Sequence, residues 1–356
     1  MRTSRALFII VASMISASTQ DRPAFAQTRP VGLVHGFSSG PATWDDLRSA
    51  LSGYSQFSFP SPPLLAASSG VSLQAGQLLS WKGAFGLGSS LILVGHSQGG
   101  LVSRSASRTD SVSGLITIGT PHQGAFIATA KPYVDAWWVD FAVASGSVGF
   151  LSNIQPYDPS YAAAQRALTH APIALQNASI VIAAGLSAIP TGNPSLTDMT
   201  PGSALLAGSN GLNTLPTLEK TGRRYAIVGQ LNAGYEGGPV RLLPGATDAF
   251  SDFIGTDLVL WSFQLEQDAL DLYDVSGFWH VQAVFGLHDM SAMLYNFAPF
   301  WTYTVVGGYP NDAVVPSYSQ AGLPSSSAIP VVVTSISHLE ETKQWASILG
   351  RLFLVP

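Results

Sequence analysis

The sequence predicts an α/β fold in which a mostly parallel central sheet has helices on both faces and an inserted, mainly helical cap. Three observations lead to this prediction. Short apolar runs alternate with helical or irregular segments along the chain. One of these runs ends at a glycine-rich motif with a serine at its centre. Two long stretches rich in alanine and aromatic residues interrupt the alternation.

The sheet is predicted from five apolar runs, most of which end at a glycine or a turn. Uninterrupted apolar runs of this length are typical of strands that are buried on both faces of a sheet. The runs cover residues 30–36, 91–94, 115–118, 224–228 and 329–334. We expect a helix over 101–106, directly after the second run, and a closing helix over 340–354.

The cap is predicted from residues 125–197 and 232–310, which are too long to be structureless connections in a compact domain. The overall composition shifts little along the chain, so we expect inserted helices and not a second, independent domain. Aromatic residues gather at 125–150 and 278–301. In the second stretch, Val281, Val284 and Phe285 could share one helix face, with Phe278 one turn earlier. These aromatic residues indicate either the core of the cap or an apolar roof over an acyl chain.

Residues 1–26 have the features of a secretory signal peptide. Arg2 and Arg5 precede an apolar run over 6–15, and Ala24-Phe-Ala26 is a small-x-small cleavage site. We therefore expect cleavage near Ala26 and a secreted or periplasmic catalytic domain over 27–356. No later segment has 18 uninterrupted apolar residues, so a membrane-spanning helix is not expected there.

The composition excludes several classes of protein. The 356 residues contain no cysteine, which excludes disulfide scaffolds, thiolate metal sites and a cysteine nucleophile. The net charge is −5 and only 10% of residues are charged, so the chain lacks the basic surface of a nucleic-acid-binding protein. The hydrophobic content of 46% excludes a disordered chain.

The strongest chemical signal is Gly95-His-Ser-Gln-Gly99, which fits G-x-S-x-G between a predicted strand and a predicted helix. In this motif a tight turn holds the serine in a strained conformation, so its neighbours two residues away must be small. Gly95 and Gly99 meet this condition. The turn lifts the Ser97 hydroxyl to a helix N-terminus, where free backbone N–H groups can bind an anion.

A serine nucleophile needs a base. Of the seven histidines, only His338 follows the last predicted strand, which is where this kind of sheet places the base, after the acid. Asp312 lies in an Asn-Asp turn in the required order and is the strongest candidate acid. Asp289 and Asp257 are rivals without a comparable motif. Either 225–228 or 302–306 could lead into the acid-bearing loop.

The turn after the first predicted strand supplies candidates for an oxyanion hole. The backbone N–H groups of Phe37 and Gln98 would be two preorganised donors for the developing charge on a carbonyl oxygen. We expect His35 to hold the loop and not to transfer protons. We expect His96, beside the serine, to pack or to form a local hydrogen bond.

No cofactor or metal is expected. His122, His280 and His288 with Asp289 do not have diagnostic ligand spacing. The glycines at 86 and 88 lack the third glycine of a dinucleotide loop.

Together these motifs resemble the α/β-hydrolase superfamily. Within it, the chain is most similar to the bacterial triacylglycerol lipase and esterase branch, which is related to the GPI inositol-deacylase-like and lecithin:cholesterol acyltransferase-like hydrolases. The segments that carry the resemblance are His35-Gly-Phe37, Gly95–Gly100, Gly119-Thr-Pro-His-Gln-Gly124, Asp198–Ser203, Asn311–Pro316 and His338. The resemblance implies an α/β-hydrolase fold, with Ser97 as nucleophile, Asp312 as acid and His338 as base. It also implies that Phe37 and Gln98 donate to the oxyanion.

The sequence therefore predicts a secreted serine hydrolase that cleaves lipid-like or other apolar carboxylic esters through an acyl-enzyme on Ser97. A transient contact with a lipid–water interface is expected, and a nucleic-acid partner is not. One alternative is an acyltransferase that uses the same three residues. Another is a non-catalytic lipid-binding protein on a hydrolase scaffold, and a lyase or cofactor-free oxidase on the same fold also remains open.

Overall fold

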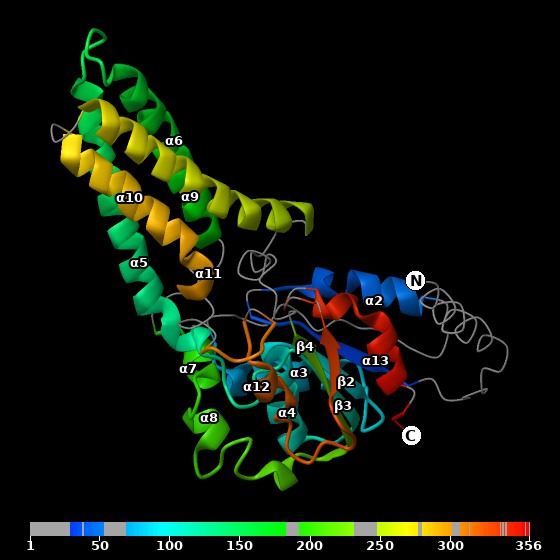
Figure 1. Ribbon diagram of the computed structural model, residues 1–356. Helices are drawn as coiled ribbons and strands as arrows, with labels where there is room; N and C mark the ends of the chain where they lie inside the picture. The colour runs from blue at the N-terminus through cyan, green and yellow to red at the C-terminus, as the bar shows by residue number, and fades with distance from the viewer. Residues whose placement is uncertain are drawn as a thin grey trace, which may run out of the picture.

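A computed structural model (Figure 1) describes residues 29–37, 39–52, 69–182, 192–230, 248–276, 280–300, 307–312, 314–334, 336, 338, 340–352 and 354–355. Five parallel strands form one sheet in the order β1-β2-β3-β4-β5. They are β1 (Val31–Val34), β2 (Ile92–His96), β3 (Val112–Ile118), β4 (Thr221–Gln230) and β5 (Val331–Thr334). Each predicted run is a strand of this sheet, which confirms the predicted α/β class.

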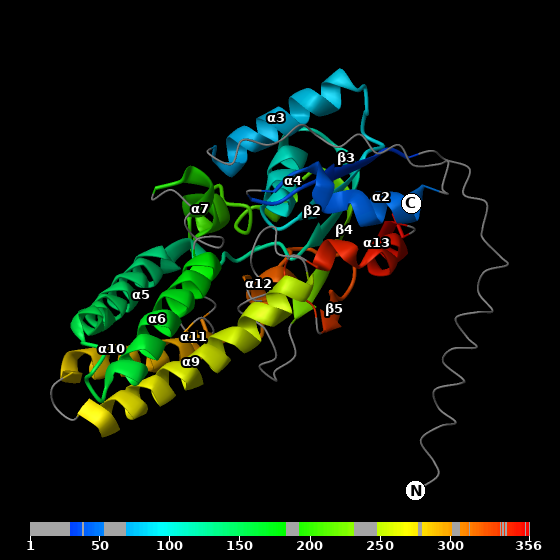
Figure 2. The same cartoon turned by 90° about the horizontal axis from the view of Figure 1, so that it is seen from above.

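Helices cover both faces of the sheet (Figures 1 and 2). Along β2, Leu93 belongs to an apolar cluster with α3 (Val71–Ala84) and α4 (Gln98–Thr109), whereas Ile92 and Val94 belong to a second cluster. The second cluster contains residues of α2 (Asp45–Leu51) and α13 (Trp345–Leu352). Because successive strand residues point to opposite faces, an unbroken apolar run fills both layers.

Short elements connect these layers. They are η2 (Pro41–Trp44), α7 (Pro194–Met199), α8 (Ala204–Ala207), η5 (Pro216–Leu218), α12 (Ser317–Ala321) and η9 (Glu341–Lys343). In α7, Asp198 Oδ2 accepts a hydrogen bond at 2.7 Å from the backbone N–H of Val71, so the Asp198–Ser203 segment anchors the start of α3. The predicted closing helix over 340–354 is interrupted, because Gln344 has φ −79° and ψ 51° between η9 and α13.

The described helices of the two insertions form a helical arm that projects from the sheet domain (Figures 1 and 2). Its helices are α5 (Ile127–Val148), η3 (Gly149–Asn153), α6 (Tyr161–Ile182), α9 (Asp248–Ser276), α10 (Val281–Tyr295) and α11 (Phe297–Phe300). Helix α5 packs against α6 and α10, and α9 packs against the same two helices. The arm is therefore a bundle of helices from both insertions.

Aromatic residues fill the core of this arm. The Trp137 ring stacks on Phe141 at 5.2 Å and meets Phe297 edge-on at 5.3 Å. Val284 packs against this core, whereas Phe285 is 61% exposed, so the predicted helix face is only partly buried. The predicted partner of that face, Phe278, and the alternative strand 302–306 lie outside the described residues.

The N-terminal segment that predicts a signal peptide also lies outside the described residues. Among the helices that the structure describes, none combines the length and apolar character needed to cross a bilayer.

Candidate active site

Ser97 forms the sharp turn between β2 and α4. Its φ of 53° and ψ of −130° are the strained backbone values that the glycine-rich motif predicts. A Cβ atom on Gly95 would lie 2.6 Å from Gly100 Cα. A Cβ atom on Gly99 would overlap the carbonyl oxygen of Val34. The turn can form only because both positions lack a side chain.

Asp312 and His338 are hydrogen-bonded to each other. His338 Nδ1 lies 2.6 Å from Asp312 Oδ2, and both side chains are buried. The backbone N–H of His338 also donates to the Asp312 carbonyl at 2.8 Å. The two residues are therefore joined through their backbones as well as through their side chains. His338 follows β5, and Asp312 lies in the loop before α12.

The Asp312 carboxylate is surrounded by donors. Its Oδ1 accepts from the backbone N–H groups of Val314 and Val315 at 2.9 and 2.7 Å. Its Oδ2 accepts from Gln320 Nε2 at 2.9 Å as well as from His338. Four donors occupy both oxygens of this carboxyl group. Asp312 can therefore fix the tautomer of His338 in which Nε2 carries no proton.

His96 connects this pair to the serine turn. Its Nε2 lies 2.9 Å from the carbonyl oxygen of His338, and the two rings are 4.7 Å apart between centroids. Burial, and secondly the neighbouring His338, keep the pKa of His96 well below its ordinary value, so His96 is neutral and donates this bond. His96 thus holds a partner 242 residues away.

No hydrogen bond joins Ser97 Oγ to His338 among the side chains that the structure describes. In enzymes without bound substrate such a contact is often long and tightens when substrate binds.

The end of β1 packs directly against the serine turn. A Cβ atom on Gly36 would lie 2.8 Å from Ser97 Cβ, so Phe37 follows the point of closest approach. Within the described part of the chain, the backbone N–H groups of Phe37 and Gln98 donate to no backbone carbonyl. His35 is buried, and its Nδ1 lies 3.0 Å from the Gly36 carbonyl oxygen. Burial lowers the pKa of His35.

The remaining histidines have separate partners. Arg104 Nη1 lies 3.1 Å from His122 Nδ1 in a buried network, whereas His288 pairs with Glu266 on the helical arm. The rival acids Asp289 and Asp257 belong to α10 and α9 of that arm.

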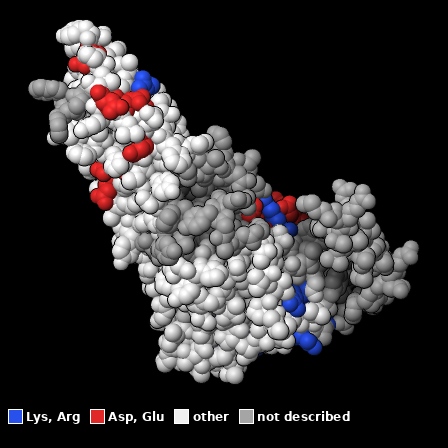
Figure 3. Space-filling model, viewed as in Figure 1, with Lys and Arg blue, Asp and Glu red and all other residues white. Residues whose placement is uncertain are grey.

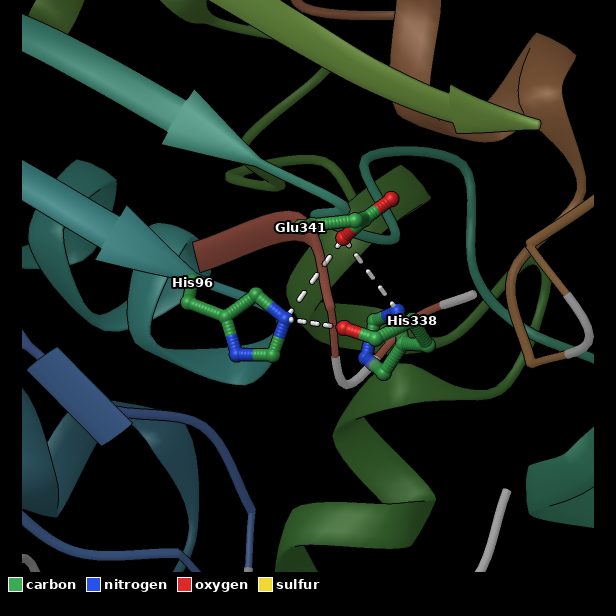
Figure 4. A group of neighbouring side chains, drawn as sticks. All are labelled: His96, His338 and Glu341. Carbon is green, nitrogen blue, oxygen red and sulfur yellow. Dashed lines mark hydrogen bonds and ion pairs between the residues drawn. The ribbon is translucent and has the colours of Figure 1, made fainter. Parts of the chain in front are cut away.

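Two residues that sequence reasoning missed complete the site. One is Gln320, whose amide donates to Asp312. The other is Glu341, whose Oε2 lies 3.5 Å from both His96 Nε2 and His338 Nδ1 (Figure 4). The sequence signal that could have identified Glu341 was a carboxylate three residues after the predicted base, His338. These three side chains bring possible metal-ligand atoms within 4.8 Å of one another, but Asp312 already holds His338 Nδ1.

One family model matches part of the chain. Residues 77–136, which contain the serine turn, match the family model of the PGAP1-like alpha/beta domain. No curated protein sequence matches the chain.

Similar solved structures include an extracellular alpha/beta-hydrolase from a Paenibacillus species, with 20% identity and a TM-score of 0.25 over 29% of this chain and 46% of that one. A thermophilic esterase from Thermogutta terrifontis has 17% identity and a TM-score of 0.37 over 92% of this chain and 91% of that one. An epoxide hydrolase from Vigna radiata has 12% identity and a TM-score of 0.35 over 92% and 91%.

The sheet, with its serine turn between β2 and α4 and with an acid and a histidine after later strands, has the arrangement of the α/β-hydrolase fold. The family match at residues 77–136 confirms the predicted resemblance for the part of the chain that carries the serine motif.

Proposed function

We propose that this chain is a serine hydrolase of carboxylic esters that acts through an acyl-enzyme on Ser97. The observation that carries the proposal is the strained turn at Ser97 next to the buried Asp312–His338 pair. A serine held in this way, with an oriented histidine behind it, is suited to attack on an acyl carbonyl.

In this mechanism the Ser97 oxygen forms a bond to the acyl carbonyl carbon and gives its proton to His338 Nε2. The backbone N–H groups of Phe37 and Gln98 stabilise the resulting oxyanion. His338 then protonates the leaving alcohol. In the second half-reaction, water attacks the acyl carbonyl carbon and gives a proton to His338. The bond to Ser97 then breaks, His338 returns the proton to the Ser97 oxygen, and the carboxylic acid is released. Because His338 must be neutral to act as a base, we expect activity to fall on acidification as it takes up a proton.

The helical arm supports a lipid-like substrate. Helices α9 and α10 of the arm carry large exposed apolar side chains, such as Phe263 and Phe285, which are 60% and 61% exposed. Phe263 meets Tyr295 edge-on at 6.2 Å, so exposed aromatic rings from α9 and α10 lie together. Acidic groups also gather on the arm (Figure 3). We therefore propose transient contact with an uncharged or zwitterionic lipid–water interface, since anionic lipids would be repelled.

The first test is hydrolysis of chromogenic esters with acyl chains from two to sixteen carbons by wild type and by Ser97→Ala. We expect activity on apolar esters that is lost in the variant, while Ser105→Ala on the same helix stays active. Activity that survives in Ser97→Ala would contradict the proposal. Ester formation with an added alcohol would favour an acyltransferase. Absence of labelling by a serine-directed phosphonate would favour a lipid-binding protein.

The interface contact has its own test. Phe263→Ser combined with Phe285→Ser should lower activity on emulsified long-chain esters and leave activity on soluble short-chain esters within about twofold, because the exposed rings lie outside the catalytic site. If the double variant lost activity on neither substrate, or lost it equally on both, relative to wild type, the interface contact would be contradicted.

We further propose that the mature protein acts outside the cytoplasm, as the N-terminal sequence predicts. N-terminal sequencing of the exported chain should begin at Gln27.

A further inference from the structure

A second carboxyl group lies inside the candidate site. Glu341 begins η9 and is 1% exposed. Its Oε2 lies 3.5 Å from His338 Nδ1 and 3.5 Å from His96 Nε2 (Figure 4). The mechanism proposed above does not use this group.

Two strands enclose this carboxyl group closely. A Cβ atom on Gly119, at the end of β3, would overlap Glu341 Oε2, and one on Gly229 in β4 would overlap Oε1. Gly119 has φ 56°, so the chain turns sharply to make room. The side chain therefore occupies a space that two glycines leave open, and its place is fixed by the sheet.

The backbone N–H of Gly229 faces this carboxyl group and acts to lower its pKa, but less strongly than burial and Asp312 raise it. Neither oxygen of Glu341 accepts a hydrogen bond from the described part of the chain. The nearby N–H of Gly229 donates to Gln320 Oε1 at 2.8 Å. A buried carboxylate without donors is costly, whereas a protonated carboxyl can itself donate to an acceptor. The acceptor beside it is the Asp312 carboxylate, since Asp312 Oδ2 and Glu341 Oε2 lie 2.6 and 3.5 Å from the same atom, His338 Nδ1.

The geometry points to Glu341 as a positioning residue: a neutral carboxyl group that donates its proton to the Asp312 carboxylate and so fixes the acid that orients His338. This inference rests on the proposed function, because it assigns a role within the same site.

The charges around Glu341 favour its neutral form. Burial is the first cause that raises the pKa of Glu341 well above its ordinary value, and the negative charge of Asp312 is the second. The other titratable groups that face it are His96 from β2 and His338, and His96 is neutral. When pH rises and Glu341 ionises, the site loses one donated hydrogen bond and gains a second buried negative charge. Asp312 keeps its four other donors, but repulsion between the two carboxylates disturbs the position from which it orients His338.

The test compares Glu341→Gln and Glu341→Ala with the adjacent control Glu340→Gln. Glutamine keeps a donor toward Asp312 but cannot ionise, so we expect kcat at neutral pH within about threefold of wild type. Alanine removes the donor, and we expect kcat to fall roughly 10- to 100-fold with KM nearly unchanged, as for loss of a hydrogen bond to a charged group. Wild type and Glu340→Gln should lose activity on the alkaline side, and Glu341→Gln should keep it.

Two results would overturn the inference. A large loss in Glu341→Gln at neutral pH would mean that an ionised Glu341 is required. An unchanged alkaline limb in Glu341→Gln would mean that the residue only fills space. The pH profile of Glu341→Gln decides the matter even if Glu341→Ala does not fold. Ser97→Ala run in parallel separates the two proposals, since failure of the proposed function would leave that variant active.

Discussion

Replacing Asp312 with asparagine changes a single atom at the centre of the site. Besides the proton that we assign to Glu341, four donors converge on this carboxylate: two backbone N–H groups at 2.7 and 2.9 Å, the Gln320 amide at 2.9 Å and His338 Nδ1 at 2.6 Å. An asparagine has only one acceptor oxygen. The two backbone donors should keep that oxygen, so the new NH₂ group turns toward Gln320 and His338.

The consequence for His338 is a change of tautomer. Its Nδ1 must now accept a hydrogen bond, so the ring proton moves to Nε2, which is the nitrogen that has to receive the proton of Ser97. We therefore expect Asp312→Asn to lower kcat by roughly 10⁴-fold. The free energy of unfolding should fall by about 1–3 kcal/mol, because the Gln320 amide then faces another donor.

The assay is hydrolysis of a soluble short-chain ester, with thermal unfolding measured in parallel. Asp289→Asn is the matched control, because Asp289 is an exposed carboxylate on α10 that sequence reasoning had left as a rival acid. We expect this control to keep kcat within about twofold of wild type. A loss below tenfold in Asp312→Asn, with the fold intact, would refute the orienting role. A large loss in the control would point to a different acid.

Three further predictions concern stability. Glu219→Gln should lower the free energy of unfolding by about 3–5 kcal/mol, since Glu219 Oε1 binds the fully buried Arg104 at 2.9 and 3.0 Å. Arg104→Met should cost less, because Arg224 remains 3.5 Å from Glu219; equal losses in chemical denaturation would contradict this. The raised pKa of Glu341 means that the folded chain holds a proton that the unfolded chain loses above about pH 4.5. Stability should therefore fall as pH rises from there to the folded pKa, by up to about 1.4 kcal/mol per pH unit, and urea titrations of Glu341→Gln should lack this slope. Gly99→Ala should cost about 1–3 kcal/mol and abolish most ester hydrolysis, because its methyl group meets the β1 backbone; a normal melting temperature with full activity would refute this.

Local sequence determined the sheet and the serine turn. Four of the strands were predictable because strands buried on both faces are continuously apolar, and such runs are visible without any partner. The fifth, β5, lies at the edge of the sheet with Val332 53% exposed, so its apolar run predicted the strand but not its burial. The turn at Ser97 was predictable because its steric requirement for Gly95 and Gly99 falls within five consecutive residues. The order of Asp312 and His338 along the chain followed from where parallel strands end.

The boundary of the C-terminal helix was less predictable. The pattern over 340–354 is apolar enough for one helix, but the chain breaks at Gln344 and begins a separate α13. Likewise, Val284 and Phe285 lie three and four residues after Val281, so helical spacing alone places both on its face. Only the packing of α10 against α5 and α9 decides which of them is buried.

The sequence by itself therefore determined the strands, the strained serine and the chain order of its acid and base, because each depends on residues that are neighbours in the chain or on strand ends. Tertiary structure alone decided the role available to Glu341. That carboxyl meets Gly119, Gly229 and Asp312, which come from three distant segments. Only when the sheet brings these segments together does the carboxyl lose contact with water, and this burial is the first cause that raises its pKa.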